Sequence, residues 1–283
     1  MSFDPATFRR ESAERWARAA GGWAANRAVF QAAVSPVSAW MIEAVEPQRG
    51  QRVLELAAGP ADTGLMAAEL TRPGGTLICT DIAEEMLDTA RARAAELGLE
   101  DGVEFRVMDA EWIDLPTADV DAVLCRFGYM LLADPAAALR ETRRVLRPRG
   151  RVALATWAAR EHNPWLAVPG EELSRMTGES PDPSAPGPFA LADREVLEDA
   201  LGGAGFLETT IEQLDLTFAY EDLDTWWDVQ LDLGANLRAG VTALDPAQRD
   251  ELREAIDARL DEYVARDGSV RLPARTHVAV AGA

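Results

Sequence analysis

The sequence predicts an α/β protein built on a doubly wound, mostly parallel sheet. Two observations carry this prediction. Between residues 51 and 157, five short apolar runs alternate with helical segments, as expected for strands that are buried on both faces of a parallel sheet. Near the C-terminus, two further extended segments, Glu208–Tyr220 and Arg275–Val280, are suited to complete the sheet. The other segments read as helices that pack around it.

The five apolar runs define the predicted core strands, which are Arg52–Leu56, Thr76–Thr80, Val103–Val107, Val120–Cys125 and Arg151–Trp157. Between them, Glu84–Leu97 places its apolar residues on one helical face. Asp134 precedes a proline, which is the pattern of an N-cap followed by proline at the first helical position. Arg147–Gly150 is expected to turn the chain into the fifth strand.

The remaining chain divides into segments of different character. We expect an N-terminal helical cap at 1–50, the core at 51–157, a helical lid with one core strand at 158–245, and a C-terminal helix with the closing strand at 246–283. The lid contains a stiff proline-rich loop, 181–188, and a tryptophan-rich helix near Leu223–Leu237. Asp245-Pro246 is expected to cap an amphipathic helix that carries Leu252, Ile256, Leu260 and Val264 at four-residue spacing.

The first 50 residues are rich in large aromatic side chains and look helical. Proline starts helices better than it continues them, so we expect a break at Ser35-Pro36. Two interpretations of this segment stay open. It packs as a cap on the main domain, or it covers the binding site as a lid.

Composition excludes several classes of function. All 28 basic residues are arginine, so lysine-dependent chemistry such as Schiff-base catalysis or a P-loop is excluded. A net charge of −20 disfavours nucleic-acid partners, whose phosphates would be repelled. The two cysteines lie in apolar runs and read as buried free thiols, and no metal site is expected. Without a signal-peptide core or a membrane-length apolar run, we expect a cytoplasmic enzyme.

The most informative stretch is Arg52–Gly64, followed by a second apolar run that ends in Asp81. This is the sequence form of a βαβ nucleotide site. A dinucleotide fingerprint would read G-x-G-x-x-G, but residues 57–62 read Ala-Ala-Gly-Pro-Ala-Asp. The carboxylates of Glu55 and Asp62 disfavour a pyrophosphate here. They suit a ligand with a cationic amino or sulfonium group.

This pattern resembles motif I of the class I S-adenosylmethionine (SAM) methyltransferases, and in style it is similar to the small-molecule enzymes of the ubiquinone/menaquinone-biosynthesis type. The resemblance follows the chain from about residue 50 to 157. It implies a seven-stranded Rossmann-like sheet with an antiparallel C-terminal hairpin, and SAM as cofactor with S-adenosylhomocysteine as product. Glu55 matches the acid whose neighbourhood receives the methionine amino group. Ala57, Gly59 and Ala61 occupy the three glycine positions, of which only the middle one is glycine.

The same resemblance assigns the nucleoside end of the cofactor. Asp81 matches the ribose-binding acid; alternatively it is a helix N-cap, because Asp81 and Glu84 have the spacing of a capping box. Ile82 and Met86 match positions that pack on adenine, or they are ordinary core. Asp109 matches the acid that accepts from the adenine amine, with the backbone of Ala110 alongside, or it belongs to a surface turn.

The segment after the fourth strand is expected to meet both the methionine end of the cofactor and the acceptor. We assign Arg126 and Phe127 to the cofactor and Tyr129 and Met130 to the acceptor, with simple packing as the alternative. Tryptophans of the lid are further candidates for the acceptor site, namely Trp157, Trp165, Trp226 and Trp227. They favour a bulky apolar or aromatic small molecule, although they also fit a lid core.

Methyl transfer from a sulfonium is an in-line displacement, which depends on positioning and on exclusion of water. A base is needed only if the acceptor must lose a proton, and His162 is then the candidate, unless it is a solvated loop residue. Two other classes stay open: a SAM-binding enzyme that catalyses a cyclisation or rearrangement, and, less favoured, an NAD-dependent dehydrogenase. The small-molecule acceptor is unidentified, and the oligomeric state is open between monomer and homodimer.

Overall fold

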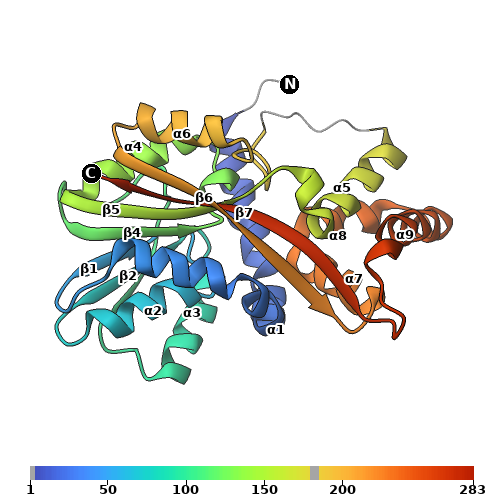
Figure 1. The fold of residues 1–283 in the computed structure, drawn as a ribbon, viewed down its shortest axis with the longest axis horizontal. Helices are drawn as coiled ribbons and strands as arrows, with labels where there is room; N and C mark the ends of the chain where they lie inside the picture. Colours follow the sequence, from blue (N-terminus) through green and yellow to red (C-terminus); the bar gives the residue numbers. More distant parts are fainter. Residues whose placement is uncertain (1–3, 179–184) are drawn as a thin grey trace.

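The computed structural model describes residues 4–178 and 185–283, so part of the predicted proline-rich loop lies outside the described residues. Within them the strands form one sheet in the order β3-β2-β1-β4-β5-β7-β6, and helices cover both of its faces (Figure 1). The order runs outward in two directions from β1 and β4, which confirms the doubly wound fold.

Five strands of the sheet run parallel, and they are β1 (Arg52–Glu55), β2 (Thr76–Asp81), β3 (Val103–Val107), β4 (Val120–Arg126) and β5 (Leu146–Trp157). The last two, β6 (Leu207–Tyr220) and β7 (Val270–Gly282), pair antiparallel with each other, and β7 also pairs antiparallel with β5. The expected antiparallel hairpin is therefore confirmed. Its far half extends past the carboxyl ends of the parallel strands, toward α5, α7, α8 and α9 (Figure 1).

The fifth strand begins at Leu146, whereas the sequence predicts Arg151. Residues 147–150 stay within the strand, and a register shift between Val120 and Ala122 absorbs the irregularity on β4. Arg149 adopts a left-handed conformation with φ of 71°. Glycine is the usual residue in this conformation, which costs a non-glycine residue roughly 1–2 kcal/mol.

The remaining helices are α2 (Asp62–Thr71), α3 (Glu84–Leu97), α4 (Pro135–Val145), α5 (Pro164–Thr177), α6 (Arg194–Gly203), α7 (Leu223–Leu233), α8 (Ala235–Ala243) and α9 (Pro246–Leu260). Short 3-10 turns, η1 to η3, lie at Tyr129–Leu131, Arg160–His162 and Asp261–Tyr263. The predicted caps are present: Asp134 accepts from the Ala137 amide at 2.8 Å, and Asp245 forms a capping box with Gln248. The expected helix near Leu223–Leu237 is in fact two helices that divide at Gly234. Val264 lies beyond α9 and bridges to Val270.

The N-terminal helix α1 runs without interruption from Pro5 to Val45, so the expected break at Pro36 is wrong. A proline inside a helix costs about 3 kcal/mol. On either side of the exposed Pro36, the side chains of Val34, Val37 and Met41 are fully buried. Each such burial contributes roughly 1.5–3 kcal/mol, so tertiary packing outweighs the local preference.

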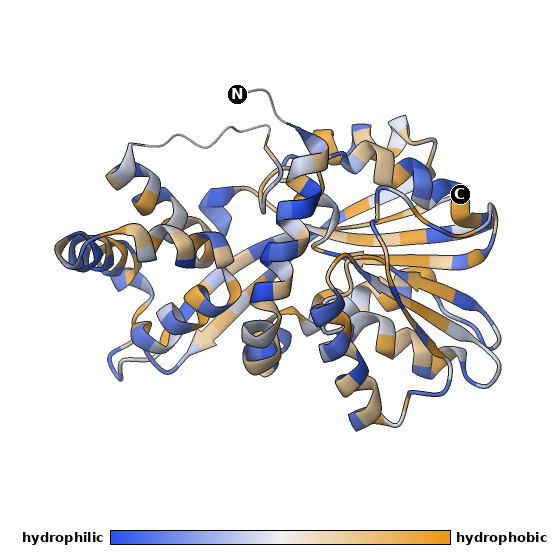
Figure 2. Ribbon diagram, turned by 180° about the vertical axis from the view of Figure 1, so that it is seen from behind, coloured by the Kyte–Doolittle hydropathy of each residue, from blue (hydrophilic) through white to orange (hydrophobic). Residues whose placement is uncertain are grey.

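Apolar residues concentrate in the sheet and on the inner faces of the helices, while outer helix faces are hydrophilic (Figure 2). Helix α1 is long and apolar enough by composition to cross a membrane, with an 18-residue window of mean hydropathy 1.3. In this fold 44% of that window is buried, and α1 packs on α3, α7, β5 and β6. An interior helix of a soluble protein has the same length and composition, so this feature is weak evidence for a membrane segment.

Candidate functional site

The loop between β1 and α2 has an alternating left-handed backbone. Ala57, Gly59 and Ala61 have φ values of 48°, 53° and 60°. A non-glycine residue in this conformation costs roughly 1–2 kcal/mol, so glycine is the usual occupant. The two alanines therefore adopt the backbone that glycines would take rather than reshape it. The hydrogen bond from the Ala58 amide to the Thr80 carbonyl, 2.9 Å long, ties this loop to β2.

Asp81, at the carboxyl end of β2, links the loops that follow β1 and β2. Its Oδ2 accepts from the Gly59 amide at 2.9 Å, and its Oδ1 accepts from the Ala83 amide at 3.1 Å. The N-cap of α3 is Ala83, so the alternative interpretation of Asp81 as that cap is wrong. A carboxylate has about four acceptor positions, and two of them remain for a ligand. Burial raises the pKa of Asp81 above its usual range.

Glu55, at the end of β1, is a buried acid. Its Oε1 accepts from the Gly64 amide at 2.9 Å, and its Oε2 has no hydrogen-bond partner among the described residues. Burial raises the pKa of Glu55 to about 8, opposed by the nearby Arg126 cation. A Cβ at position 64 would lie 2.1 Å from Oε2, so only glycine fits there. Glu55 is therefore mostly protonated at neutral pH.

From the sequence, Asp62, the first residue of α2, is expected to bring an uncompensated negative charge to the site. In the structure this charge is paired. Oδ1 of Asp62 lies 2.6 Å from Nη1 of Arg27, which projects from α1. The carboxylate is thus compensated, and its repulsion of a pyrophosphate is weaker than the sequence alone indicates.

Asp109 and Glu111, in the loop after β3, are held by a residue that the sequence did not single out. Nε of Arg9, in the first turns of α1, donates to Glu111 at 2.9 Å and lies 3.6 Å from Oδ2 of Asp109. Oδ1 of Asp109 accepts from the Glu111 amide at 2.9 Å, and Oε1 of Glu111 accepts from the Ala133 amide at 2.8 Å. Burial raises the pKa of Asp109. Among the described residues, no backbone amide donates to Oδ2 of Asp109.

The expected adenine-packing residues lie in the same region. Met86 and Ala110 are buried, and Ile82 is half-buried. Met86 forms a small apolar cluster with Ala83 and with two alanines of α1, Ala19 and Ala20. The nucleoside side of the site is therefore covered by α1 in this structure.

The segment after β4 also faces α1. Nη1 of the half-buried Arg126 donates to Oε1 of Gln31 at 2.7 Å and to Oγ of Ser38 at 2.9 Å. Burial lowers the pKa of Arg126. Phe127 has a φ of 62°, and its ring stacks on Trp157 with centroids 4.0 Å apart.

Phe127 belongs to what we call the aromatic cluster, which comprises Phe30, Phe127, Trp157, Trp165 and Phe218. Its rings come from α1, the end of β4, the end of β5, α5 and β6. Trp165 and Phe218 stack at 4.0 Å, and Trp157 meets Trp165 edge-on at 5.2 Å. This apolar group adjoins the end of β4, where an acceptor would lie beside the methionine end of a cofactor.

Two of the expected acceptor residues are committed elsewhere. The Tyr129 side chain is fully buried, and its hydroxyl lies 2.6 Å from Oγ1 of Thr142 on α4. Trp226 on α7 is also fully buried and pairs with the half-buried Trp227. Met130 is buried in the main core. Apart from Trp227, these acceptor candidates are all buried in the same core, and Trp157 and Trp165 differ from Tyr129, Met130 and Trp226 in that they join Phe127 beside the end of β4.

We predict that Tyr129→Phe lowers the free energy of unfolding by about 1 kcal/mol, because it removes the hydroxyl and leaves Thr142 with one partner fewer. Cofactor and acceptor binding should stay within about two-fold of the wild type. Urea denaturation and titration calorimetry measure the two effects. A loss of activity at unchanged stability would instead assign Tyr129 to the acceptor.

His162 lies exposed on η2, beside the ion pair between Arg275 and Asp215 on the outer strands. No contact in the described residues joins it to the groups at the ends of β1, β2 and β4. His277 is buried in β7, with Nε2 2.9 Å from the Ala192 carbonyl, and burial lowers its pKa. A base role for His162 therefore gains no support from its position.

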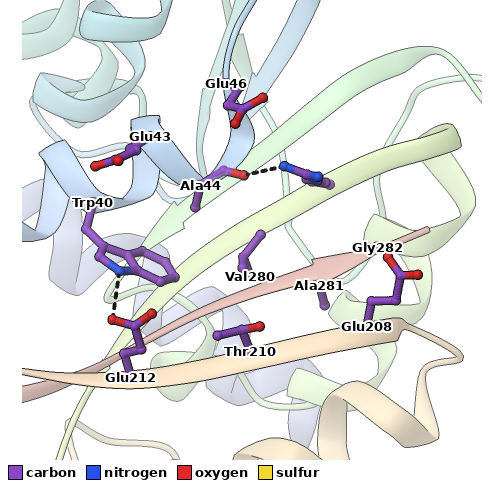
Figure 3. Close-up of a pocket in the computed structure, with 11 residues that line it drawn as sticks. Trp40, Glu43, Ala44, Glu46, Glu208, Thr210, Glu212, Val280, Ala281 and Gly282 are labelled. Carbon is purple, nitrogen blue, oxygen red and sulfur yellow. Dashed lines mark hydrogen bonds between the residues drawn. The ribbon is translucent and has the colours of Figure 1, made fainter.

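A cleft of about 630 Å³ lies at the opposite, amino end of the parallel strands. Trp40, Glu43 and Glu46 at the end of α1 face Glu208 and Glu212 of β6 across it (Figure 3). Within residues 4–178 and 185–283, no cluster of three or more His, Cys, Asp or Glu side chains is arranged to hold a metal ion. The two cysteines are buried and free.

Comparisons with known proteins agree with this geometry. Residues 54–154 match a family model described as a methyltransferase domain. The chain is 32% identical over 126 residues to a ubiquinone/menaquinone biosynthesis C-methyltransferase from Cellvibrio japonicus, covering 44% of this chain and 50% of that one. It is 39% identical over 107 residues to the Acidiphilium cryptum enzyme of the same description, covering 38% and 42%. The chain thus spans about half the length of the curated relatives it matches.

The fold has solved counterparts as well. The YcgJ protein from Bacillus subtilis superposes with a TM-score of 0.61 at 21% identity, over 88% of this chain and 98% of that chain. At this identity the similarity concerns the fold alone. The superposed share of this chain extends well beyond residues 54–154, which the family model matches.

Proposed function

We propose that this chain, which belongs to the class I SAM-dependent methyltransferases, transfers the SAM methyl group to a small aromatic acceptor. The observation that carries the proposal is the arrangement around Asp81. Its carboxylate bridges the left-handed loop after β1 and the start of α3, and it keeps two acceptor positions for ribose hydroxyls.

The other buried acids fit the same cofactor. Glu55 has an oxygen without a partner among the described residues, which suits the region of the methionine amino group. Asp109 has one oxygen free of backbone donors, which suits the adenine amine. All three carboxyls have pKa values raised by burial, so each gains from a ligand that brings donors or positive charge.

The acceptor is proposed to be a planar aromatic molecule with a hydroquinone-like ring, methylated at carbon. The aromatic cluster next to Phe127 supports an aromatic acceptor, since rings prefer stacked or edge-on neighbours. The curated relatives are described as C-methyltransferases of ubiquinone and menaquinone biosynthesis, which supports this substrate class.

Catalysis is proposed to come from positioning. The sulfonium of bound SAM supplies the electrophilic methyl carbon. Phe127 and Trp157, whose rings stack on each other, provide an apolar wall beside the acceptor and exclude water, while Arg126 fixes the end of β4 against α1. A hydroquinone releases one hydroxyl proton to solvent, which makes its ring carbon nucleophilic. After that carbon takes the methyl group and S-adenosylhomocysteine departs, the ring C–H proton moves to the carbonyl oxygen and restores the aromatic hydroxyl. This chemistry therefore does not require the exposed His162 as a base.

Titration calorimetry with SAM, S-adenosylhomocysteine and NADH tests the cofactor. Micromolar binding of the first two and no heat with NADH are expected; the opposite pattern would overturn the proposal. The acceptor is tested separately by mass spectrometry of reduced naphthoquinones and of matched catechols and amines incubated with SAM. Methylated naphthoquinol supports the substrate class. An unmethylated but rearranged product would place the chain among non-methylating enzymes of this fold.

A further inference from the structure

We propose that Arg9 is a positioning residue of the cofactor site, which holds residues 5–20 of α1 closed over its adenine end. The inference rests on the function proposed above, because it takes Asp109 and Met86 as part of a nucleoside pocket. It assigns a kinetic role to a segment that sequence reasoning left open between cap and lid.

One face of α1 runs across the ends of the strands. Its contact residues recur at intervals of seven and four, which keeps them on one side of a helix. These residues are Arg9, Trp16, Ala20, Arg27, Gln31 and Ser38. In that order they meet the loop after β3, the start of α3, the start of α2, and Arg126 at the end of β4. Ser38 is also bonded to Thr63 of α2. Helix α1 therefore contacts the segments that follow β1, β2 and β3 and the end of β4.

The two halves of α1 are held differently. From Phe30 onward, its buried side chains belong to the main core of the protein. Ala19 and Ala20 belong instead to a separate small cluster, whose other buried members are Ala83 and Met86. The N-terminal half is therefore attached through a few small contacts, to Ala83 and Met86 on one side and to Ala235 and Asn236 of α8 on the other.

Between the halves lie Gly21 and Gly22. A Cβ at Gly22 would lie 2.3 Å from the Asp232 carbonyl oxygen, so that glycine is required by the close approach of α7. A Cβ at Gly21 would meet nothing within 4 Å, so no contact requires glycine there. Glycine weakens a helix by roughly 0.5–1 kcal/mol relative to alanine. Gly21 thus makes the junction between the two halves a place where α1 bends or frays most easily.

Arg9 attaches the N-terminal end of α1 to the loop after β3. Its guanidinium donates to Oε2 of the buried Glu111, whose Oε1 is already held by the Ala133 amide. Both Glu111 oxygens are thus engaged by protein donors, so the bond to Glu111 does not need to break when a ligand occupies Asp109; only the longer approach of Arg9 Nε to Oδ2 of Asp109, 3.6 Å, is shared with the ligand. We call the bond between Arg9 and Glu111 the latch. Because it forms in both the free and the ligand-bound protein, it slows association and dissociation of the cofactor alike and leaves the equilibrium affinity nearly unchanged.

The test compares Arg9→Gln with Arg10→Gln, which removes the same charge from the exposed neighbouring position. Stopped-flow tryptophan fluorescence measures association and dissociation of S-adenosylhomocysteine. We expect Arg9→Gln to raise both rate constants about five- to twenty-fold with Kd within three-fold, and Arg10→Gln to leave both near wild type. Gly21→Ala, which stiffens the junction without a clash, should lower both rate constants about two- to five-fold.

Hydrogen exchange without ligand gives a readout that does not depend on the cofactor. Amides of residues 8–20 should exchange at least five-fold faster in Arg9→Gln than in Arg10→Gln, while residues 33–45 stay protected in both. Equal exchange in the two variants would overturn the latch. The latch would also be overturned if Arg9→Gln bound more weakly because dissociation became faster while association stayed unchanged, since Arg9 would then contact the ligand directly. If S-adenosylhomocysteine fails to bind the wild type, the proposed function fails, and the exchange result still decides the latch.

Discussion

Asp81→Ala is expected to weaken the binding of S-adenosylhomocysteine by about 1–3 kcal/mol, or roughly 5- to 150-fold. The buried carboxylate keeps two acceptor positions after it has bound the amides of Gly59 and Ala83. Ribose hydroxyls would fill them, and alanine would leave these hydroxyls without partners in a site shielded from water. Titration calorimetry at a temperature where both proteins are folded measures the loss.

The same substitution also removes two backbone hydrogen bonds, so a drop in melting temperature is expected and does not distinguish the roles of Asp81. A ligand pair does. The analogue of S-adenosylhomocysteine that lacks both ribose hydroxyls should bind the wild type about 1–3 kcal/mol more weakly than the parent compound. The Asp81→Ala variant should bind the two compounds nearly equally. If both proteins discriminate to the same extent, Asp81 serves only to join the two loops.

The strands and the acids at their ends could be predicted from the sequence because both depend on local pattern. Val103–Val107 and Glu84–Leu97 have the predicted bounds, since short apolar runs and a helical apolar face are read within one element. Glu55 lies at the end of such a run, Asp81 directly follows one, and Asp109 comes two residues after another. In a parallel sheet the carboxyl ends of the strands share one edge, so these side chains are brought to the same side.

What the sequence could not supply are contacts between distant segments. Arg9 and Glu111 are 102 positions apart, and no local pattern pairs them. The path of α1 through Pro36 depends on the burial of Val37 and Met41 against the sheet, which outweighs a local helix-breaking signal. The seven- and four-residue spacing of the α1 contacts is visible in the sequence. The spacing indicates one contact face of α1, but only the fold shows which loops lie beneath that face.

Aromatic side chains show the same limit. Tyr129 and Trp226 lie in segments that were expected to shape an acceptor pocket, but both are fully buried in packing contacts. Phe30 and Phe218 complete the aromatic cluster from α1 and β6, and nothing in their local sequence assigns them to it. Whether a large apolar residue faces a pocket or the core is decided by the packing of several elements.

A second large effect is expected for Glu55→Gln, as a change in how stability depends on pH. The pKa of Glu55 is about 8 in the folded protein and near 4.5 when unfolded, so between these values the folded state holds a proton that the unfolded state has released. The contribution of Glu55 is therefore fully present below about pH 4.5 and is lost as pH rises toward 8. The loss approaches about 1.4 kcal/mol per pH unit for one proton.

Glutamine keeps the carbonyl oxygen that accepts from the Gly64 amide and cannot ionise. The difference in unfolding free energy between Glu55→Gln and wild type should be smallest near pH 5 and should grow in favour of the variant up to pH 8. Urea denaturation across this range measures it, and other titrating groups cancel in the difference. Glu69→Gln on the exposed face of α2 serves as the control, with curves parallel to the wild type. Parallel curves for Glu55→Gln as well would mean that Glu55 stays ionised in the folded protein.

If Glu55 is ionised in the folded protein, the cofactor's amino group meets a carboxylate that is already charged, and binding at pH 7 releases no proton. If the pKa of Glu55 is raised, the positive charge of the bound amino group lowers it again, and Glu55 releases its proton to solvent. Calorimetry in buffers of different ionisation enthalpy should detect the release of up to one proton for each molecule of SAM bound.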